Sequence, residues 1–306
     1  MVDLIGDIHG HADKLEEILA IMGYVKEGGV YQHPAKRKLV FLGDYIDRGP
    51  KIRETLQIVK SMCDAGHALA IMGNHEFNAI CFHTKDKVKG GFYRKHTVVE
   101  IDQHIETLRQ FRNYTQEWEQ VYLPWFHTLP LYLEQDDFRA VHACWDDAHI
   151  NWLETNTIYE EIQGQKRISE KVLAQYVAKE SPVYEVLEEL LKGKEFDLPA
   201  GQEFVDKDGT TRKSARIKWF QPVEDRKLHK DVFLGIGEEF GELLLDESIH
   251  EALHRYDADK SVFFGHYWLK GKPTDALAKS ICLDYSVAKD GHLVAYRLDA
   301  QEFVIV

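Results

Sequence analysis

Short apolar runs recur along the first third of the chain, and each ends directly at a glycine. Residues 39–42 (Leu-Val-Phe-Leu) precede Gly43, and residues 68–72 (Ala-Leu-Ala-Ile-Met) precede Gly73. Apolar runs of this length predict buried strands. Because glycine lets the backbone turn sharply, each strand is expected to present the polar side chains that follow it at its carboxyl end.

Helical periodicity separates these strands. Apolar residues recur at helical spacing over residues 15–22 before Gly23, and a second helix is expected over residues 52–63, with Ile52, Leu56 and Val59 facing inward. Alternating strands and helices predict parallel pairing, which collects the segments after the strands at one edge of the sheet.

The pattern changes in the second half of the chain. Residues 84–125 are polar with a helical period, and the strand-like run 138–141 leads into His142. Short β-type runs then follow closely at residues 262–264, 280–283, 293–296 and 303–306, and the turn at residues 289–291 predicts a hairpin. Together these patterns predict an α/β fold in which a two-sheet sandwich is flanked by helices.

A long segment of largely helical pattern covers residues 148–259 and includes a periodic apolar stretch after Ser181 and Pro182. It is too long for a connecting loop, so we predict a helical cap beside the functional site, where substrate choice would be made. Residues 206–209 (Asp-Lys-Asp-Gly) lack the other ligand positions of a calcium-binding loop, so a plain turn is expected there.

The polar residues after the first three strands point to a metal site. Asp7, His9, Asp44, Asn74 and His75 are all expected at the same sheet edge. A mixed set of carboxylate, amide and imidazole ligands suits divalent metals such as manganese, iron or zinc. The sequence does not choose among manganese, iron, zinc and nickel, of which manganese is expected first.

Three ordered motifs contain these residues: residues 6–10 (Gly-Asp-Ile-His-Gly), 43–49 (Gly-Asp-Tyr-Ile-Asp-Arg-Gly) and 73–76 (Gly-Asn-His-Glu). They resemble the GDxHG, GDxxDRG and GNHE signatures of the phosphoprotein phosphatase (PPP) superfamily of calcineurin-like metallophosphoesterases. The resemblance covers residues 1–80 and returns at His142 and His266. It implies a four-layer α-β-β-α fold, with residues 1–306 as one metallophosphoesterase domain and residues 150–260 as a mainly helical cap within it.

The resemblance also implies a ligand for each position of a dinuclear metal site. Asp7, His9 and Asp44 would hold the first metal, and Asp44, Asn74, His142 and His266 the second, so that Asp44 bridges the pair. The residue after His142 is Ala143, where the family usually has glycine.

Further residues are expected to act on the phosphate and on the proton. The resemblance implies that His75 donates a proton to the leaving oxygen, with Asp47 orienting its ring. Arg48 supplies a planar fork for two phosphate oxygens, and Arg216 is the candidate for a second basic group. Asp146 and Asp147 either orient a metal-bound histidine or are simply solvated, and the other histidines, including His11, His33, His67 and His104, are expected to be non-functional.

Charge and composition narrow the partners. The net charge is −13 without a long Lys/Arg block, which argues against a nucleic-acid duplex as substrate. No apolar stretch approaches the length of a membrane span. The first motif lies close to Met1 and the four cysteines show no paired spacing, so we expect a cytoplasmic protein with reduced thiols.

The function expected first is metal-dependent hydrolysis of phosphomonoesters, as in a protein phosphatase acting on phosphoserine, phosphothreonine or phosphotyrosine in peptides. The alternative is hydrolysis of dinucleoside polyphosphates such as diadenosine tetraphosphate, because bacterial enzymes of that class carry related motifs. A phosphodiesterase or nuclease and a metal-binding scaffold without catalysis remain further alternatives.

Overall fold

The computed structural model describes all residues except 163, 199–200, 206–210, 221–231, 237–259 and 275–277. The predicted turn at residues 206–209 therefore lies outside the described residues. No helix in the described part of the chain is both long enough and apolar enough to cross a membrane.

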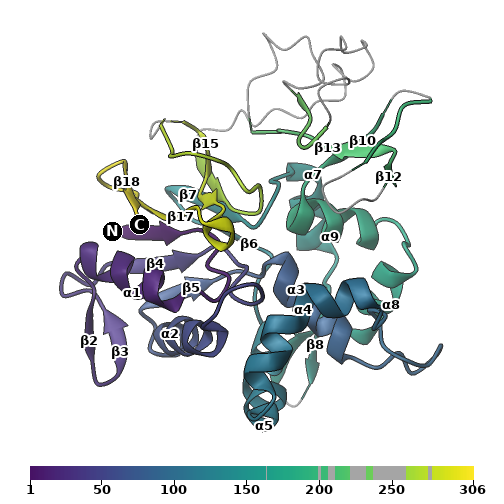
Figure 1. The fold of residues 1–306 in the computed structure, drawn as a ribbon, viewed down its shortest axis with the longest axis horizontal. Helices are drawn as coiled ribbons and strands as arrows, with labels where there is room; N and C mark the ends of the chain where they lie inside the picture. The colour runs from purple at the N-terminus through teal and green to yellow at the C-terminus, as the bar shows by residue number, and fades with distance from the viewer. Residues whose placement is uncertain (163, 199–200, 206–210, 221–231, 237–259, 275–277) are drawn as a thin grey trace.

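The strands form two larger sheets within the described residues (Figure 1). The first has the order β16-β17-β1-β4-β5 with β18 beside β17, and the second the order β15-β14-β7-β6. Their bounds are β1 (Val2–Ile5), β4 (Lys38–Phe41), β5 (Ala68–Ala70), β6 (Tyr132–Glu134), β7 (Phe138–Val141), β14 (Ser261–Phe264), β15 (Ser280–Cys282), β16 (Asp284–Tyr285), β17 (His292–Arg297) and β18 (Glu302–Ile305).

The parallel pairing expected for the first strands is confirmed. β4 pairs in parallel with both β1 and β5, so the segments after all three strands leave the sheet at the same edge. In the second sheet β14 pairs in parallel with β7 and β15. The segments after β7 and β14, which contain His142 and His266, therefore also leave at one edge.

The predicted hairpin has a different first strand. The turn at residues 289–291 connects β16 with β17, which are antiparallel. Residues Ser280–Cys282, expected beside this turn, instead form β15 of the second sheet. The chain changes sheets between Cys282 and Asp284, which periodicity alone does not reveal.

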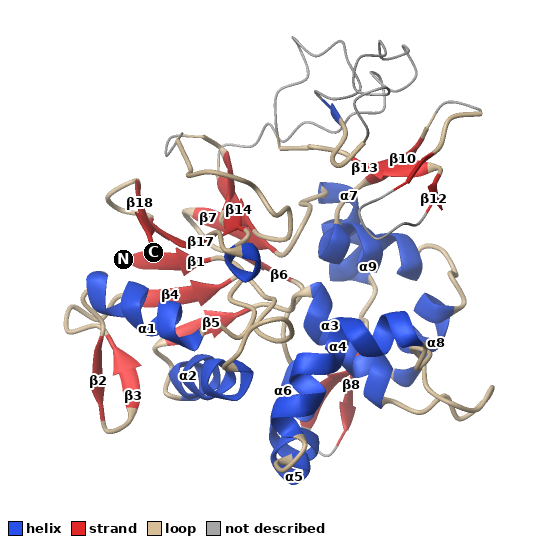
Figure 2. Ribbon diagram, in the orientation of Figure 1, coloured by secondary structure: helices blue, strands red, loops and turns tan. Residues whose placement is uncertain are grey.

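A small apolar core lies between the two sheets. It joins Leu4, Val40 and Tyr296 of the first sheet to Phe138 and Phe263 of the second. The rings of Phe263 and Tyr296 lie 5.0 Å apart. A larger core, which contains buried residues of α1 (Ala12–Ile21) and α2 (Ile52–Asp64), covers the first sheet on the side of these helices (Figure 2).

The remaining elements surround these sheets or extend from them. The helices are α3 (Asn74–His83), α4 (Val98–Phe111), α5 (Thr115–Glu117), the π-helical turn η1 (Trp118–Tyr122), α6 (Leu123–Phe126), α7 (Asp147–Thr155), α8 (Glu170–Val177), α9 (Val183–Lys192) and the short 3₁₀ helix η2 (Val287–Lys289). The two-stranded pairs are β2 (Val25–Glu27) with β3 (Val30–Gln32), β8 (Tyr159–Ile162) with β9 (Gln165–Ile168), β10 (Glu195–Asp197) with β13 (Ser214–Arg216), and β11 (Phe204–Val205) with β12 (Thr211–Arg212).

The segment predicted as a mainly helical cap is mixed in its described part. It contains α8, α9 and most of α7, and also the short antiparallel pairs β8–β9, β10–β13 and β11–β12. The helical expectation holds in α9, where the period is clearest. The apolar residues that follow Pro182 at helical spacing are all buried: Val183, Val186, Leu187, Leu190 and Leu191. Strands of two to four residues are too short to leave a comparable signal in the sequence.

Candidate metal centre

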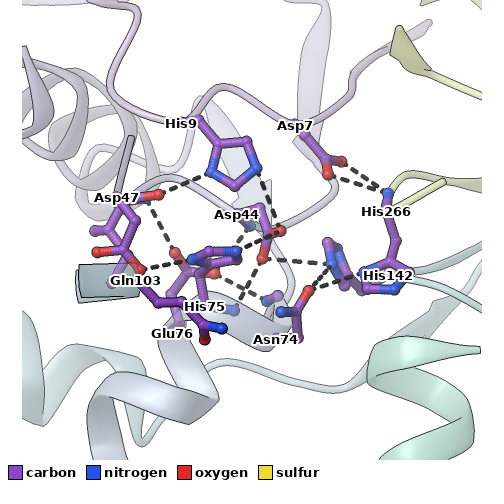
Figure 3. Close-up of polar contacts among 12 residues, drawn as sticks. Asp7, His9, Asp44, Asp47, Asn74, His75, Glu76, Gln103, His142 and His266 are labelled. Atoms are coloured by element: carbon purple, nitrogen blue, oxygen red, sulfur yellow. Dashed lines mark hydrogen bonds and ion pairs between the residues drawn. The ribbon is translucent and has the colours of Figure 1, made fainter. Parts of the chain in front are cut away.

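The segments that follow five strands converge on one cluster of polar side chains (Figure 3). Asp7 and His9 follow β1, Asp44 and Asp47 follow β4, Asn74 and His75 begin α3 after β5, and His142 and His266 follow β7 and β14. All eight are buried. The structure thus brings together every residue expected as a metal ligand, with the expected proton donor and its partner beside them.

Two glycines allow this close approach. A Cβ atom on Gly265 would lie 1.8 Å from Oδ1 of Asp7, and one on Gly73 would lie 2.2 Å from Oδ1 of Asp44. Any other residue at these positions would therefore displace a carboxylate of the cluster.

Asp44 lies at the centre, and its two carboxylate oxygens face different histidines. Oδ2 lies 3.6 Å from Nε2 of His9 and 3.9 Å from Nε2 of His75, whereas Oδ1 lies 3.3 Å from Nε2 of His142. The ligand atoms form two overlapping sets, His9 with Asp44 and His75, and Asp44 with His142 and His266, each within 4.8 Å. A carboxylate shared by two such sets has the placement of a bridging ligand.

Backbone carbonyl groups fix the orientation of two of these rings. Nδ1 of His142 lies 2.8 Å from the carbonyl oxygen of Leu42, and Nδ1 of His9 lies 2.9 Å from that of Ile46. A ring that donates from Nδ1 keeps the lone pair on Nε2 for a metal. Nε2 of His9 and Nε2 of His266 are buried and have no hydrogen-bond partner. These orphaned nitrogens fit metal ligation.

The charges of the cluster also fit cations. Burial lowers the pKa of His9 to about 3, so this ring is neutral, the form that binds metals. Burial, followed by the charges of Asp284 and Asp44, raises the pKa of Asp7 well above its usual value. Buried carboxylates this close together repel each other, and divalent cations between them would remove that repulsion.

Asp7 and Asn74 connect the two halves of the cluster. The backbone N–H of His266 donates to both carboxylate oxygens of Asp7, at 3.0 and 3.2 Å. The amide oxygen of Asn74 lies 2.9 Å from Nδ1 of His266 and 3.0 Å from Nε2 of His142. Asn74 therefore lies where it can share a metal with these two histidines.

His75 and Asp47 form the expected pair, with Nδ1 of His75 2.6 Å from Oδ2 of Asp47. Burial lowers the pKa of His75, but the charge of Asp44 and the hydrogen bond to Asp47 outweigh it and hold this pKa above its usual value. The ring is therefore biased toward its protonated form, as a proton donor requires.

His104, which we expected to be non-functional, contacts Asp47. Nδ1 of His104 lies 2.7 Å from Oδ1 of Asp47, and the hydroxyl of Thr107 donates to the same oxygen at 2.5 Å. Thr107 also accepts the backbone N–H of Asp47 at 3.0 Å. Both residues lie on α4, in a stretch where the sequence shows no motif. Burial raises the pKa of Asp47, but His104 and His75 reverse this and hold it well below its usual value.

Glu76 supports the loop of Asp44, a role that the sequence does not reveal beyond its place in the third motif. Its carboxylate accepts the backbone N–H groups of Asp44 and Gly73 on one oxygen, and those of Tyr45 and Ile46 on the other. Burial, with the charge of Asp44, raises the pKa of Glu76 to about 7.

The two arginines expected at the site lie near its margin. The exposed Arg48 stacks on the ring of Trp268, with 4.6 Å from guanidinium to ring centroid. Arg216, at the end of β13, forms an ion pair with Glu195 at 3.3 Å. Burial is the main cause that lowers the pKa of His266, and the charge of Arg216 lowers it further. Arg216 thus reaches the electrostatic environment of the cluster.

Asp146 and Asp147 do not orient a histidine of the cluster. Asp146 caps α7 by accepting the backbone N–H groups of Ala148 and His149, and Asp147 accepts the indole N–H of Trp145. Nδ1 of His142 instead contacts the carbonyl oxygen of Leu42.

Residues 1–267 match a family model described as calcineurin-like phosphoesterase. Among curated relatives, the asymmetrical bis(5'-nucleosyl)-tetraphosphatase PrpE of Halalkalibacterium halodurans is 32% identical over 174 residues, which cover 53% of this chain and 66% of that protein. The protein of the same name from Oceanobacillus iheyensis is 42% identical over 74 residues, which cover 24% of this chain and 30% of that protein. The chain thus spans 66% of the first relative's length and under a third of the second's.

Among solved structures, a protein serine/threonine phosphatase from Saccharomyces cerevisiae is 15% identical, covering 100% of this chain and 78% of that chain with a TM-score of 0.47. A likeness of this degree carries no inference about function.

Proposed function

Because the chain belongs to the calcineurin-like phosphoesterase family, we propose that it hydrolyses phosphate compounds with two divalent cations, and that dinucleoside polyphosphates are its substrates. The observation that carries the metal-dependent chemistry is the position of Asp44, whose two oxygens face two different sets of nitrogen ligands. The residues proposed to hold the cations are Asp7, His9, Asp44, Asn74, His142 and His266.

The cations, when bound, would polarise phosphate oxygens and make a water molecule more acidic. The protein side chains have three further tasks in this proposal. His75 holds a proton for the leaving oxygen, and Asp47 keeps the ring of His75 charged and oriented. Arg48 binds phosphate oxygens from the exposed margin, and Arg216 is the proposed second basic group.

The relatives favour dinucleoside polyphosphates over phosphorylated peptides as the substrate class. Both relatives described above are named bis(5'-nucleosyl)-tetraphosphatases. A protein phosphatase, which was the function expected first from the motifs, is therefore the second candidate. In this proposal residues 1–306 form one domain in which the two sheets are the sandwich, and residues 150–260 are an insertion that brings Arg216 toward His266.

The test is a comparison of substrates with protein supplied with Mn²⁺. Diadenosine tetraphosphate, a phosphotyrosyl peptide, a phosphoseryl peptide and p-nitrophenyl phosphate are offered separately, and products are separated by chromatography. We expect kcat/KM for diadenosine tetraphosphate to exceed that for either peptide by at least tenfold. Equal or higher values for a peptide would reject the proposed substrate class.

A paired variant tests the role of the metals. Asp44→Asn should lower kcat by several orders of magnitude, because it removes the charge of the proposed bridging ligand. Asp136→Asn, the same change at an exposed position between β6 and β7, is the matched control and should retain wild-type activity. Near-normal turnover by Asp44→Asn would refute the dinuclear mechanism.

A further inference from the structure

Two cationic side chains meet on one aromatic ring beside the candidate metal centre. The ammonium group of Lys289 lies 4.4 Å from the centroid of the Trp268 ring, and the guanidinium group of Arg48 lies 4.6 Å from it. The same indole lies 5.5 Å from the ring of His9. Arg48 and Lys289 are exposed and Trp268 is partly buried, so this margin of the site faces solvent.

The ring and Lys289 are fixed by the backbone around them. Trp268 has a φ of 51°, in the left-handed region that a bulky residue rarely adopts. Its backbone N–H donates to Oδ2 of the buried Asp284 at 2.7 Å, and Oδ1 of Asp284 accepts the N–H of Ser286 at 2.9 Å. Asp284 therefore ties the segment carrying Trp268 to the start of η2, which ends at Lys289.

The connection between β16 and β17 is also held from the opposite side. The carbonyl of Gly291 accepts a hydrogen bond from Nζ of Lys14 on α1 at 2.9 Å. Asp290, beside Lys289, acts electrostatically on His11 at the start of α1. The position of Lys289 near the metal centre is thus set by contacts on both sides of its turn.

The electrostatics of this arrangement favour an anion with several charges. Two positive charges on one ring repel each other, although the indole face attracts each of them. This pair of neighbouring positive charges contrasts with the chain as a whole, which has a net charge of −13. Arg48 makes no ion pair with a carboxylate among the described residues that would balance its charge. A phosphate chain can contact both cations at once, because each of its phosphate groups has its own negative charge and acceptor oxygens.

We propose that Arg48, Trp268 and Lys289 form a subsite for those phosphate groups of a nucleoside polyphosphate that extend beyond the phosphate held at the metal centre. This rests on the proposed function and deepens it. A phosphomonoester has no group to place in the subsite, whereas the phosphate chain of a polyphosphate reaches it. The subsite therefore selects polyphosphates over single phosphates.

The test measures binding of inorganic tripolyphosphate and of orthophosphate by calorimetry, with the concentration of free Mn²⁺ held constant. In Lys289→Gln we expect the Kd for tripolyphosphate to rise about tenfold, as for the loss of one charged contact. The Kd for orthophosphate should change less than twofold. Lys289→Arg should keep most of the tripolyphosphate affinity. Lys36→Gln removes one exposed charge before β4, at the end of that strand away from the candidate site, and should keep all of the affinity.

The outcomes separate this proposal from the proposed function. An unchanged Kd for tripolyphosphate in Lys289→Gln, or an equal loss in Lys36→Gln, would overturn the subsite even if the wild-type protein hydrolyses diadenosine tetraphosphate. A selective loss in Lys289→Gln supports the subsite even if the wild-type protein hydrolyses no dinucleoside polyphosphate.

Discussion

Glu76→Gln is the substitution whose cost follows most directly from the structure. Oε2 of Glu76 accepts the N–H groups of Asp44 and Gly73 at 2.9 and 3.1 Å, and Oε1 accepts those of Tyr45 and Ile46 at 2.8 and 3.3 Å. The side chain is fully buried. Glutamine has the same shape but replaces one oxygen with an NH₂ group, which cannot accept hydrogen bonds.

The magnitude follows from counting donors. Each oxygen of Glu76 serves two N–H groups, so either orientation of the glutamine amide leaves two buried donors without an acceptor. A buried, unsatisfied donor costs about 1–3 kcal/mol, which gives a loss of about 2–6 kcal/mol in the free energy of unfolding. Either orientation leaves at least one N–H group of residues 44–46 without an acceptor. Because these residues form the turn that carries Asp44, turnover should fall as well.

The assay is urea unfolding followed by tryptophan fluorescence at a pH of about 8.5, where Glu76, with its pKa of about 7, is ionised, together with kcat in the presence of Mn²⁺. Glu17→Gln, the same change on the exposed face of α1, is the control and should alter the free energy of unfolding by less than about 0.5 kcal/mol. If Glu76→Gln proves as mild as Glu17→Gln, the carboxylate does not hold the turn and the reasoning is wrong.

Three further predictions concern the proton donor and the metals. Asp47→Asn removes a negative charge that raises the pKa of His75 and leaves at most a neutral hydrogen bond in its place, so the decline of kcat at alkaline pH should move to lower pH. An unchanged pH–rate profile would exclude His75 as the donor. Thr107→Val keeps the side-chain shape but removes both contacts with Asp47. It should lower kcat about tenfold with little change in KM, whereas wild-type kcat would show that α4 does not position Asp47. Mn²⁺ at about 100 times its Kd should stabilise the protein by about 2.7 kcal/mol and raise Tm by about 4 °C in a thermal scan. A full shift in Asp44→Asn would place the metal elsewhere.

The first half of the site could be predicted because its signals are local. The runs that form β4 and β5 are apolar, short and followed by glycine, so their position, their parallel pairing and the polar residues after them can be read in order. Asp7, His9, Asp44 and Asn74 lie within these motifs, and the structure places them together as expected. A ligand that follows a strand directly needs no knowledge of distant contacts.

Contacts between distant parts of the chain were decided only by the tertiary structure. Thr107 and His104 lie on α4 about 60 positions from Asp47, and nothing in their neighbourhood marks them for it. Trp268 contacts Arg48 and Lys289 only because the fold brings the segments after β4 and β14 next to the end of η2. Periodicity records which face of an element is buried, but not which other element covers that face. The sequence by itself therefore determined the motifs of the candidate metal centre and the strands before them, whereas packing determined what surrounds and orients these motifs.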